Sequence, residues 1–598
     1  MCGINFLLNF PGRGEAAIKK MLEATRHRGP DHSSWLEAAP GIFMAGNRLK
    51  TQDLGEAGNQ PVRLKDKKAL LVWNGAVYNH QELRNALLDR GVVFYSRSDA
   101  EVLMQWLRMF GQEGVKDLQG MFAFVFMDME KGHIIIGRDP YGKKPLYFFQ
   151  KDDQWLISSE ARAIAHSGLV ERQFDASQYP AYFYSRHAFP EGSFFKEIHQ
   201  WMPGQVITLD FDGNRVSEFF PKQEPKPGNL LTVGEFELLA RDAVLKHMEA
   251  DVPVGILLSG GADSSLLLHL WNKERGIPLH TFTAVFEKKY RKKYADADFA
   301  SGLAKKYRSA HHEVLITPDI VLQHWETYID SLDQPIGDSA GFLTWMLASE
   351  AKKYVKILIS GAGADELFGG YDRHKALLMY LKHSGIFDFL RQRKILFPLL
   401  PRRIGKLLKA VCDSPQETYL NFASLEPIPA HFKGKFLSYF PREGSPYKAA
   451  LAFDRQYYLV NDVLKIHDNA TMAHGVEGRA PFMDRSMVEL SNNLSESQLR
   501  KLGSKQWIRE ILTREGYGKI ANRRKLGFGL PLKEWLGTNP EFSTRIFSLV
   551  KHFEATAGEA FPEDMRKLAR HPEKYVRAGF LQIWNLFVLA SWKEKQGL

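Results

Sequence analysis

The sequence predicts two folds in succession: an α+β layered N-terminal domain, then an α/β doubly wound parallel-sheet domain with a helical C-terminal extension. Three observations favour this order. Short β-type runs dominate the first 220 residues, strand and helix patterns alternate after them, and mostly helical patterns follow residue 372. A polar, proline-rich stretch at residues 221–228 lies between the two halves and is typical of a linker.

The N-terminal half carries the clearest strand signals. Apolar runs at residues 69–73, 122–126 and 134–137 are bounded by turn residues, and helical patterns occupy the regions near 80–90 and 99–110. Strand runs with a few intervening helices predict layers of sheet and helix. We place this first domain at residues 2–220.

The C-terminal half alternates between element types. Residues 235–248 show an amphipathic helical pattern, and residues 254–258 form a continuously apolar run, as in a strand buried on both faces of a parallel sheet. Similar runs occur at 279–283 and 355–359, with helical patterns between them. This alternation predicts a doubly wound sheet. We place the second domain at residues 230–598, with a helical insertion at about 372–450.

The composition limits the possible classes of protein. Apolar residues make up 44% and charged residues 25% of the 598 residues, which is ordinary for a globular chain. The net charge of +11 fits a nucleic acid or an anionic substrate such as a nucleotide. Two cysteines exclude a disulfide framework and a cysteine zinc site. Because neither a signal-peptide pattern nor an apolar run of about 18 residues is present, we expect a cytoplasmic protein without a transmembrane segment.

One of the two cysteines, Cys2, directly follows Met1. Removal of Met1 would place the Cys2 thiol beside a free α-amino group, whose ordinary pKa of about 8 suits a base at neutral pH. A nucleophile with a base in its own backbone is a known arrangement for covalent catalysis. The alternative is an incidental cysteine at the end of the chain.

Two loops in the C-terminal half have the composition of a phosphate site. Residues 259–265 (Ser-Gly-Gly-Ala-Asp-Ser-Ser) follow an apolar run and open a helix, so free backbone N–H groups and the helix dipole favour an anion. A plain helix-capping turn is the alternative. Asp263 fits a phosphate site if it holds Mg²⁺, and Asp365, in the similar loop 360–370, would complete the metal ligands. Lys505 is a candidate cation for a leaving pyrophosphate.

The motifs and their order resemble the glutamine-hydrolysing asparagine synthetases, which join a class II glutamine amidotransferase domain to an N-type ATP pyrophosphatase domain. The motifs that carry the resemblance lie at residues 2–4, 26–31, 74–79, 98–101, 138–142, 259–265, 360–371, 477–484 and 525–531. Several motifs in one order are far more specific than a single match. The resemblance covers nearly the whole chain and implies an αββα, Ntn-type first domain.

For the first domain, the resemblance implies a glutaminase. Cys2 would attack the side-chain amide of glutamine, and Asn74 with the Gly75 N–H would form the oxyanion hole. The glutamine-binding residues that it implies are Arg48, Asn74, Gly75, Ala76 and Asp99. Arg48 would pair with the α-carboxylate and Asp99 with the α-ammonium. Ammonia would then pass through an internal channel to the second site.

For the second domain, the resemblance implies an ATP-dependent synthetase. The ATP-binding residues that it implies are Leu258, Ser259, Gly260, Gly261, Asp263, Ser264, Ser265, Ala284, Ser360 and Gly361. Mg²⁺ on Asp263 and Asp365, with catalytic Lys505, would neutralise the pyrophosphate. ATP would activate an acceptor carboxylate as its acyl-adenylate, and ammonia would convert it to the amide. The implied partners are therefore glutamine, ATP, a carboxylate acceptor and, as in relatives, a second copy in a homodimer.

Four positions depart from the family pattern. Ala76 stands where glutamate is usual, Ala262 replaces a leucine, and Asn469 lies where a basic residue is common near the acceptor pocket. Ala362 replaces the glutamate of Ser-Gly-Glu-Gly, a residue thought to handle protons when ammonia attacks, which alanine cannot do. The default acceptor is aspartate. The alternative is another carboxylate, such as a sugar uronate, a glycan or a secondary metabolite.

Three other functions are weaker alternatives. An RNA-modifying enzyme of the same ATP-activating superfamily fits the positive charge but leaves the glutaminase half unexplained, so we expect no nucleic-acid partner. An inactive regulatory homologue fits Ala76 and Ala362, but Cys2 and Asn74 are present. A ring-closing relative, such as a β-lactam synthetase, needs no ammonia, so the presence of Cys2 as a glutaminase nucleophile argues against it. The basic, apolar segment 382–409 suits a membrane surface or a polyanion, although a solvated helix face is the favoured interpretation.

Overall fold

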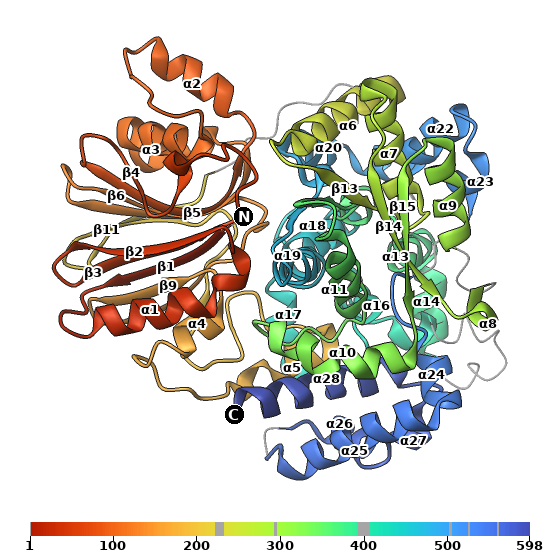
Figure 1. Cartoon of the computed structure of the whole chain (residues 1–598). Coiled ribbons are helices and arrows are strands. Elements are labelled where there is room, and N and C mark those ends of the chain that lie inside the picture. The colour runs from red at the N-terminus through yellow and green to blue at the C-terminus, as the bar shows by residue number, and fades with distance from the viewer. Residues whose placement is uncertain are drawn as a thin grey trace.

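The computed structural model describes residues 2–221, 232–291, 296–392, 407–501, 505–523, 527–558 and 561–598. The two halves of the chain form two lobes that pack side by side (Figure 1). Nearly all of the predicted linker and much of the basic segment 382–409 lie outside the described residues, as do Lys525 and Leu526. The domain boundaries and the homodimer stay predictions.

Two antiparallel six-stranded sheets build the first lobe. The first sheet has the order β10 (His199–Gln200), β8 (Tyr147–Lys151), β9 (Gln154–Ser158), β1 (Cys2–Leu8), β3 (Ile42–Arg48) and β2 (His32–Ala39). The second has the order β12 (Arg215–Phe219), β11 (Val206–Asp210), β7 (His133–Arg138), β6 (Gly120–Asp128), β5 (Ala69–Val77) and β4 (Val62–Arg63). The predicted runs at 69–73, 122–126 and 134–137 are thus the neighbouring strands β5, β6 and β7.

The alternation of side chains along the strands explains the layers of this lobe. On β1, Ile4, Phe6 and Leu8 face the second sheet, whereas Leu7 faces helix α1 (Gly14–Ala24). Helix α4 (Ala161–Ala165) packs on the same outer face as α1, and helices α2 (His80–Leu88) and α3 (Asp99–Phe110) cover the second sheet (Figure 1). This arrangement confirms the predicted αββα fold.

A five-stranded parallel sheet forms the centre of the second lobe. Its order is β15 (Ala310–Ile316), β14 (His280–Phe286), β13 (Val254–Leu257), β16 (Ile357–Ile359) and β17 (Glu477–Arg479). The order reverses at β13, so the loops after β13 and β16 emerge side by side at the carboxyl edge of the sheet, where such folds bind ligands. The sequence predicted β13, β14 and β16. It did not predict β15, which is largely polar and exposed, or β17, which has only three residues.

Helices cover both faces of this sheet and extend beyond it. Ile256 on β13 belongs to the core shared with α6 and α7, whereas Leu358 on β16 packs with Leu347 of α11 on the other face. The helices up to the second nucleotide loop are α6 (Val233–Met248), α7 (Ala262–Arg275), α8 (Lys288–Arg291), α9 (Asp296–Lys306), α10 (Pro318–Ser331), α11 (Ala340–Ala351) and α12 (Ala364–Phe368). These elements confirm the predicted doubly wound domain.

The helical extension follows residue 372, as predicted. Its helices are α13 (Asp372–Lys382), α14 (Ser384–Gln392), α16 (Pro415–Ala423), α17 (Ala430–Leu437), α18 (Pro446–Phe453), the π-helical η6 (Asp454–Val463), α19 (Leu464–Met472), α20 (Arg485–Asn493), α21 (Glu496–Lys501), α22 (Gln506–Arg514), α23 (Gly518–Asn522), α24 (Leu532–Thr538), α25 (Pro540–Thr556), α26 (Glu563–Arg570), α27 (Pro572–Tyr575) and α28 (Phe580–Gln596). Within the described ranges, none of the helices is long and apolar enough to cross a membrane.

The two lobes share one continuous apolar core. Helix α5 (Tyr179–Ser185) belongs to the first 220 residues but packs against the C-terminal helix α28. Tyr182 Oη donates to the carbonyl oxygen of Asn585 at 2.8 Å, and Asn585 Nδ2 donates to the carbonyl oxygen of Tyr182 at 2.9 Å. The core therefore fixes the lobes relative to one another and places β1 at their boundary (Figure 1).

Candidate active site

Cys2 begins strand β1 at the boundary between the lobes. Its Cα pairs with that of Arg48 on β3, and its backbone N–H donates to Asn74 Oδ1 at 3.1 Å. The side chain is buried, and burial raises the pKa of the thiol. A thiol in this environment needs a base before it can act as a nucleophile.

Asn74 and Gly75 lie next to Cys2 on strand β5. Asn74 is fully buried, and its Nδ2 has no hydrogen-bond partner within the described part of the chain. At Gly75, a Cβ atom would lie 2.1 Å from the carbonyl oxygen of Met121, so only glycine lets the two strands approach this closely. A buried, unused N–H group beside a cysteine suits the stabilisation of an oxyanion.

Three further predicted residues surround this pair. Asp99 is the first residue of α3, accepts the Val77 N–H at 3.1 Å and has its pKa raised by burial. Ala76 is buried on β5. The Arg48 guanidinium donates to the carbonyl oxygen of Gly55 at 2.6 Å and therefore holds the loop that follows β3.

The second lobe contributes a carboxylate to this site. Glu477, the first residue of β17, is fully buried and accepts a hydrogen bond from Thr51 Oγ1 at 3.2 Å. Burial opposes its ionisation, but the positive charge of the chain's N-terminus, followed by those of Arg479 and Lys144, lowers the pKa of Glu477 well below its usual range. Its negative charge contributes to the raised pKa of Cys2. The sequence marked 477–484 as a motif but did not indicate that Glu477 lies at the first site.

The predicted phosphate-site residues come together in the second lobe. Lys505 Nζ lies 2.7 Å from Asp263 Oδ2 and 2.8 Å from Asp365 Oδ1. Burial opposes the charge of Lys505, but the two carboxylates raise its pKa above the ordinary value. A cation thus lies between the two loops, although its position in the sequence is remote from both.

The loop after β13 is shaped to expose polar groups. Gly260 has a φ of +65°, and a Cβ there would lie 2.2 Å from the Asp296 carbonyl oxygen, so the tight approach needs glycine. The Ser259 N–H donates to Ser264 Oγ at 3.2 Å, which closes the loop over the start of α7. Ser265 Oγ, Ser360 Oγ and Asp263 Oδ1 are buried atoms without a hydrogen-bond partner among the described residues.

A pocket of about 500 Å³ opens beside these loops. It is lined by Leu257, Leu258, Ser259, Phe282, Thr283, Ala284, Phe286, Asp296, Leu343, Leu347, Gly527, Phe528 and Gly529. Leu258, Ser259 and Ala284 are predicted ATP-binding residues in this lining. The other seven, Gly260, Gly261, Asp263, Ser264, Ser265, Ser360 and Gly361, lie in the two neighbouring loops and the start of α7. An apolar pocket beside anion-binding loops suits a flat base with phosphates.

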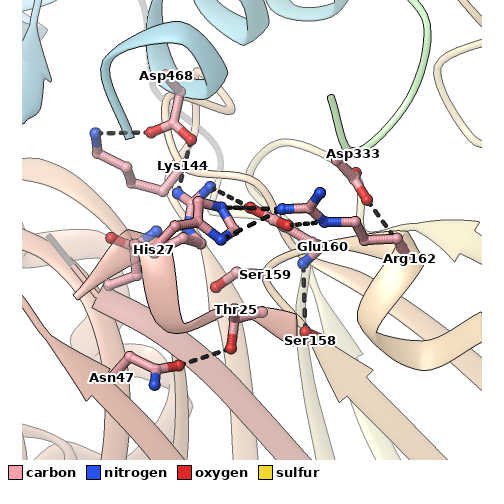
Figure 2. Close-up of polar contacts among 12 residues, drawn as sticks. Thr25, His27, Asn47, Lys144, Ser158, Ser159, Glu160, Arg162, Asp333 and Asp468 are labelled. Carbon is pink, nitrogen blue, oxygen red and sulfur yellow. Dashed lines mark hydrogen bonds and ion pairs between the residues drawn. The ribbon is translucent and has the colours of Figure 1, made fainter. Parts of the chain in front are cut away.

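A buried charge network joins the two lobes (Figure 2). Arg28 follows helix α1 and is fully buried; its Nη2 donates to Asp468 Oδ2 on α19 at 2.7 Å, and its Nε donates to the Cys2 carbonyl oxygen at 3.4 Å. Lys144 Nζ lies 3.3 Å from Asp468 Oδ1 and 3.3 Å from the Gly478 carbonyl oxygen on β17 (Figure 2). Asp468 therefore connects the Cys2 end of the first lobe to the parallel sheet of the second.

Glu160 is the second carboxylate of this network (Figure 2). Its Oε1 lies 3.1 Å from Arg28 Nη1 and 2.8 Å from His27 Nε2, and its Oε2 accepts from Arg162 Nε at 2.8 Å. The backbone N–H of Arg162 in turn donates to Asp333 Oδ1 of the second lobe at 2.8 Å. Burial opposes the charge of Glu160, but Arg162, His27 and Arg28 hold its pKa well below the usual range.

Comparison with known families assigns both halves of the chain. A family model for asparagine synthase matches residues 235–594, and a model for the glutamine amidotransferase domain matches residues 1–220. The chain belongs to the asparagine synthase family. This match confirms the resemblance and the predicted enzyme class, a ligase of the asparagine synthase type.

Individual relatives agree on the family but carry different names. Asparagine synthetase [glutamine-hydrolyzing] 1 of Bacillus subtilis is 29% identical over 87% of this chain and 85% of its own length. Asparagine synthetase B [glutamine-hydrolyzing] of Escherichia coli is 31% identical over 62% of this chain and 65% of its own length. Amidase chyE of Penicillium rubens is 25% identical over 90% of each chain. The family therefore rests on the family models, and these relatives do not fix the acceptor acid.

Replacing Glu160 by glutamine should destabilise the protein. The change leaves Arg28 buried with one carboxylate fewer, and breaking a buried ion pair costs about 3 kcal/mol or more. The loss should appear as a lower melting temperature at pH 7. Glu23→Gln is the matched control, because the exposed Glu23–Arg26 pair should contribute about 0.5 kcal/mol or less.

The difference in stability between wild type and Glu160→Gln should depend on pH. Because the folded pKa of Glu160 is lowered, its contribution is complete above the unfolded value of about 4.3 and is lost as the pH falls through the folded pKa. The difference in stability between wild type and Glu160→Gln should therefore persist from pH 7 to about pH 5 and shrink below about pH 4. A difference that grows on acidification would contradict a charged, stabilising Glu160.

Proposed function

We propose that the chain hydrolyses glutamine at Cys2 and uses the ammonia to amidate a carboxylate that it activates with ATP. The observation that carries this proposal is the pairing of two complementary sites in one chain. One site sets a buried thiol beside Asn74 Nδ2, which has no partner among the described residues, and the other sets Lys505 between Asp263 and Asp365. The buried contact of Arg28 with Asp468 joins the two lobes that carry these sites.

In the first half-reaction, the α-amine freed by removal of Met1 takes the proton of the Cys2 thiol. The thiolate attacks the amide carbon of glutamine, while Asn74 Nδ2 and the Gly75 N–H stabilise the oxyanion. Ammonia leaves, and water hydrolyses the thioester to glutamate. The raised pKa of Cys2 supports the need for this base. The predicted glutamine contacts complete the site, with Asp99 and Arg48 binding the α-ammonium and the α-carboxylate.

In the second half-reaction, the apolar pocket holds the base of ATP and the two loops hold its phosphates. Lys505 neutralises the pyrophosphate as it leaves, and the acceptor carboxylate becomes an acyl-adenylate that ammonia converts to the amide. The residues fit a Mg²⁺ ion, because Asp263 Oδ1 has no partner in the part of the chain that the structure describes, and Mg²⁺ commonly binds one or two carboxylates plus phosphate oxygens. Asp263 and Asp365 would hold the ion, which would supply further positive charge to the phosphates.

The acceptor depends on the loop that contains Ala362. Aspartate is the default acceptor for this family. Ala362 is partly buried against the core and offers no proton acceptor where the family pattern has glutamate. This substitution favours the alternative of a carboxylate other than aspartate, such as a uronate.

Replacing Cys2 by alanine should separate the two half-reactions. The variant should lose glutamine hydrolysis and glutamine-dependent amide formation, because the nucleophile is gone. It should keep amide formation when ammonium chloride supplies the nitrogen, since the second site is untouched. Glutamate release and pyrophosphate release measure the two steps. Glutamine-dependent synthesis at the wild-type rate in the variant would contradict Cys2 as the nucleophile.

Replacing Asn74 by alanine should lower kcat for glutamine hydrolysis by about 10²–10³-fold, the usual cost of one oxyanion donor. Glutamate release under saturating glutamine measures this effect. Ammonia-dependent synthesis should be unaffected. Asn85→Ala provides a matched control, since Asn85 is exposed on α2 and should leave kcat unchanged. A change in KM alone at position 74 would indicate a binding role instead.

A panel of acids tests the ligase activity and the acceptor together. With Mg-ATP and ammonium chloride, we expect one acid of the panel, either the default L-aspartate or another carboxylate, to support pyrophosphate release, and mass spectrometry to detect its amide product. D-Glucuronate and other carboxylates test the alternative. Turnover with aspartate alone would exclude a non-aspartate acceptor. No release with any acid, together with no ATP–pyrophosphate exchange, would contradict the proposed ligase.

A further inference from the structure

Arg523 is a partly buried cation beside the loop at residues 259–265, and the steps above do not use it. It directly follows helix α23, and its side chain is 13% exposed. Its Nη1 donates to the Gly260 carbonyl oxygen at 3.3 Å, and its Nη2 pairs with Asp296 Oδ1. Its guanidinium carbon lies 4.8 Å from the centroid of the Phe299 ring. These contacts hold a planar cation against the loop.

Asp296, the first residue of α9, connects this cation to the nucleotide pocket. Asp296 lines the pocket together with residues 527–529. Its carbonyl oxygen also lies against the loop, because a Cβ atom at Gly260 would lie 2.2 Å from it. Arg523 therefore contacts both the loop proposed for the phosphates and the lining of the pocket proposed for the base.

The charges assigned so far to the phosphate site do not balance a triphosphate. Lys505 is the cation of that site, but the carboxylates of Asp263 and Asp365 lie 2.7 and 2.8 Å from its Nζ. A Mg²⁺ ion would have to neutralise these carboxylates as well as the phosphates. Enzymes that transfer or release phosphoryl groups commonly place further cations around the phosphates. Arg523 is a further cation at the same loop.

A guanidinium has the right chemistry for this ligand. Its N–H groups form a planar fork that matches the oxygens of a phosphate, and several of them can donate at once. Arg523 can therefore keep its contact with the Gly260 carbonyl oxygen while it donates to a phosphate oxygen. The Asp296 carboxylate and a phosphate are both anions, so they compete for the same guanidinium.

We propose that Arg523 binds the β- and γ-phosphates of ATP, the part that leaves as pyrophosphate, and that Asp296 competes with them for its guanidinium. The inference rests on the proposed function and adds a nucleotide-binding residue that lies outside the sequence motifs at 259–265, 360–371 and 525–531. Arg523 makes and breaks no bond. Its positive charge stabilises the negative charge that moves onto the pyrophosphate as the acyl-adenylate forms.

The test compares ATP with AMP, which lacks these two phosphates, on the full-length protein without an acceptor acid. In Arg523→Gln, the Kd for Mg-ATP should rise about tenfold, equivalent to about 1.4 kcal/mol, whereas the Kd for AMP should stay within about twofold of wild type. Isothermal titration calorimetry measures both constants. An unchanged Kd for Mg-ATP, or an equal loss of affinity for AMP, would overturn the proposal.

Asp296→Asn separates phosphate binding from a structural ion pair. This change removes the competing negative charge but keeps the size of the side chain, so the Kd for Mg-ATP should fall. If the pair with Arg523 only shaped the pocket, Asp296→Asn would instead weaken Mg-ATP binding as Arg523→Gln does, and that result would overturn the proposal. Arg514→Gln is the matched control, because Arg514 lies on α22 with half of its side chain exposed and should leave both constants unchanged.

Arg523→Lys covers the case in which Arg523→Gln does not fold, which a loss of glutamate release from glutamine would report. Lysine keeps the positive charge but lacks the fork, so the Kd for Mg-ATP should rise about threefold while that for AMP does not change. An unchanged Kd for Mg-ATP in Arg523→Lys would then overturn the proposal.

The failure of this inference differs from the failure of the proposed function. If the wild type binds Mg-ATP and forms amide from ammonium chloride but the Arg523 variants bind Mg-ATP as tightly, only the role of Arg523 fails. If the wild type neither forms amide with any acid of the panel nor exchanges pyrophosphate with ATP, the ligase proposal fails.

Discussion

The burial of the Arg28 guanidinium is the constraint on which the arrangement of the lobes depends. A fully buried charge costs several kcal/mol unless carboxylates pair with it. Glu160 supplies one partner from the first lobe and Asp468 supplies the other from the second, 440 residues further along the chain. The lobes must therefore pack with the start of β1 facing α19. Both candidate sites take their relative positions from this contact.

Because the lobes pack in this way, both of them contribute residues to the first site. Its strand positions come from one lobe, where β1, β3 and β5 bring Cys2, Arg48 and Asn74 together. The second lobe changes the electrostatic environment of this site, because Glu477 on β17 adds a buried negative charge. Since β17 also pairs with the strand that leads into the second nucleotide loop, a displacement of the lobes would move this charge and that loop together relative to Cys2.

The two sites differ in the kind of charge that they must stabilise. The first must stabilise a charge that appears only during reaction, and it presents the neutral amide of Asn74, which costs little to bury in the resting enzyme. The second must hold phosphates that are charged from the outset. It keeps Lys505 ionised by pairing it with Asp263 and Asp365.

The sequence by itself determined the classes of the two domains and the local chemistry of both sites. Short apolar runs bounded by turn residues identified β5 and β6, and glycines with serines after an apolar run identified the loop at 259–265, because these features depend on neighbours in the chain. Only the tertiary structure brought Glu477 beside Cys2 and placed Asn469 at the boundary with the first lobe, near Arg138 and Tyr147. The reason is physical: periodicity shows which side chains are buried, whereas their partners across the chain depend on how whole layers pack.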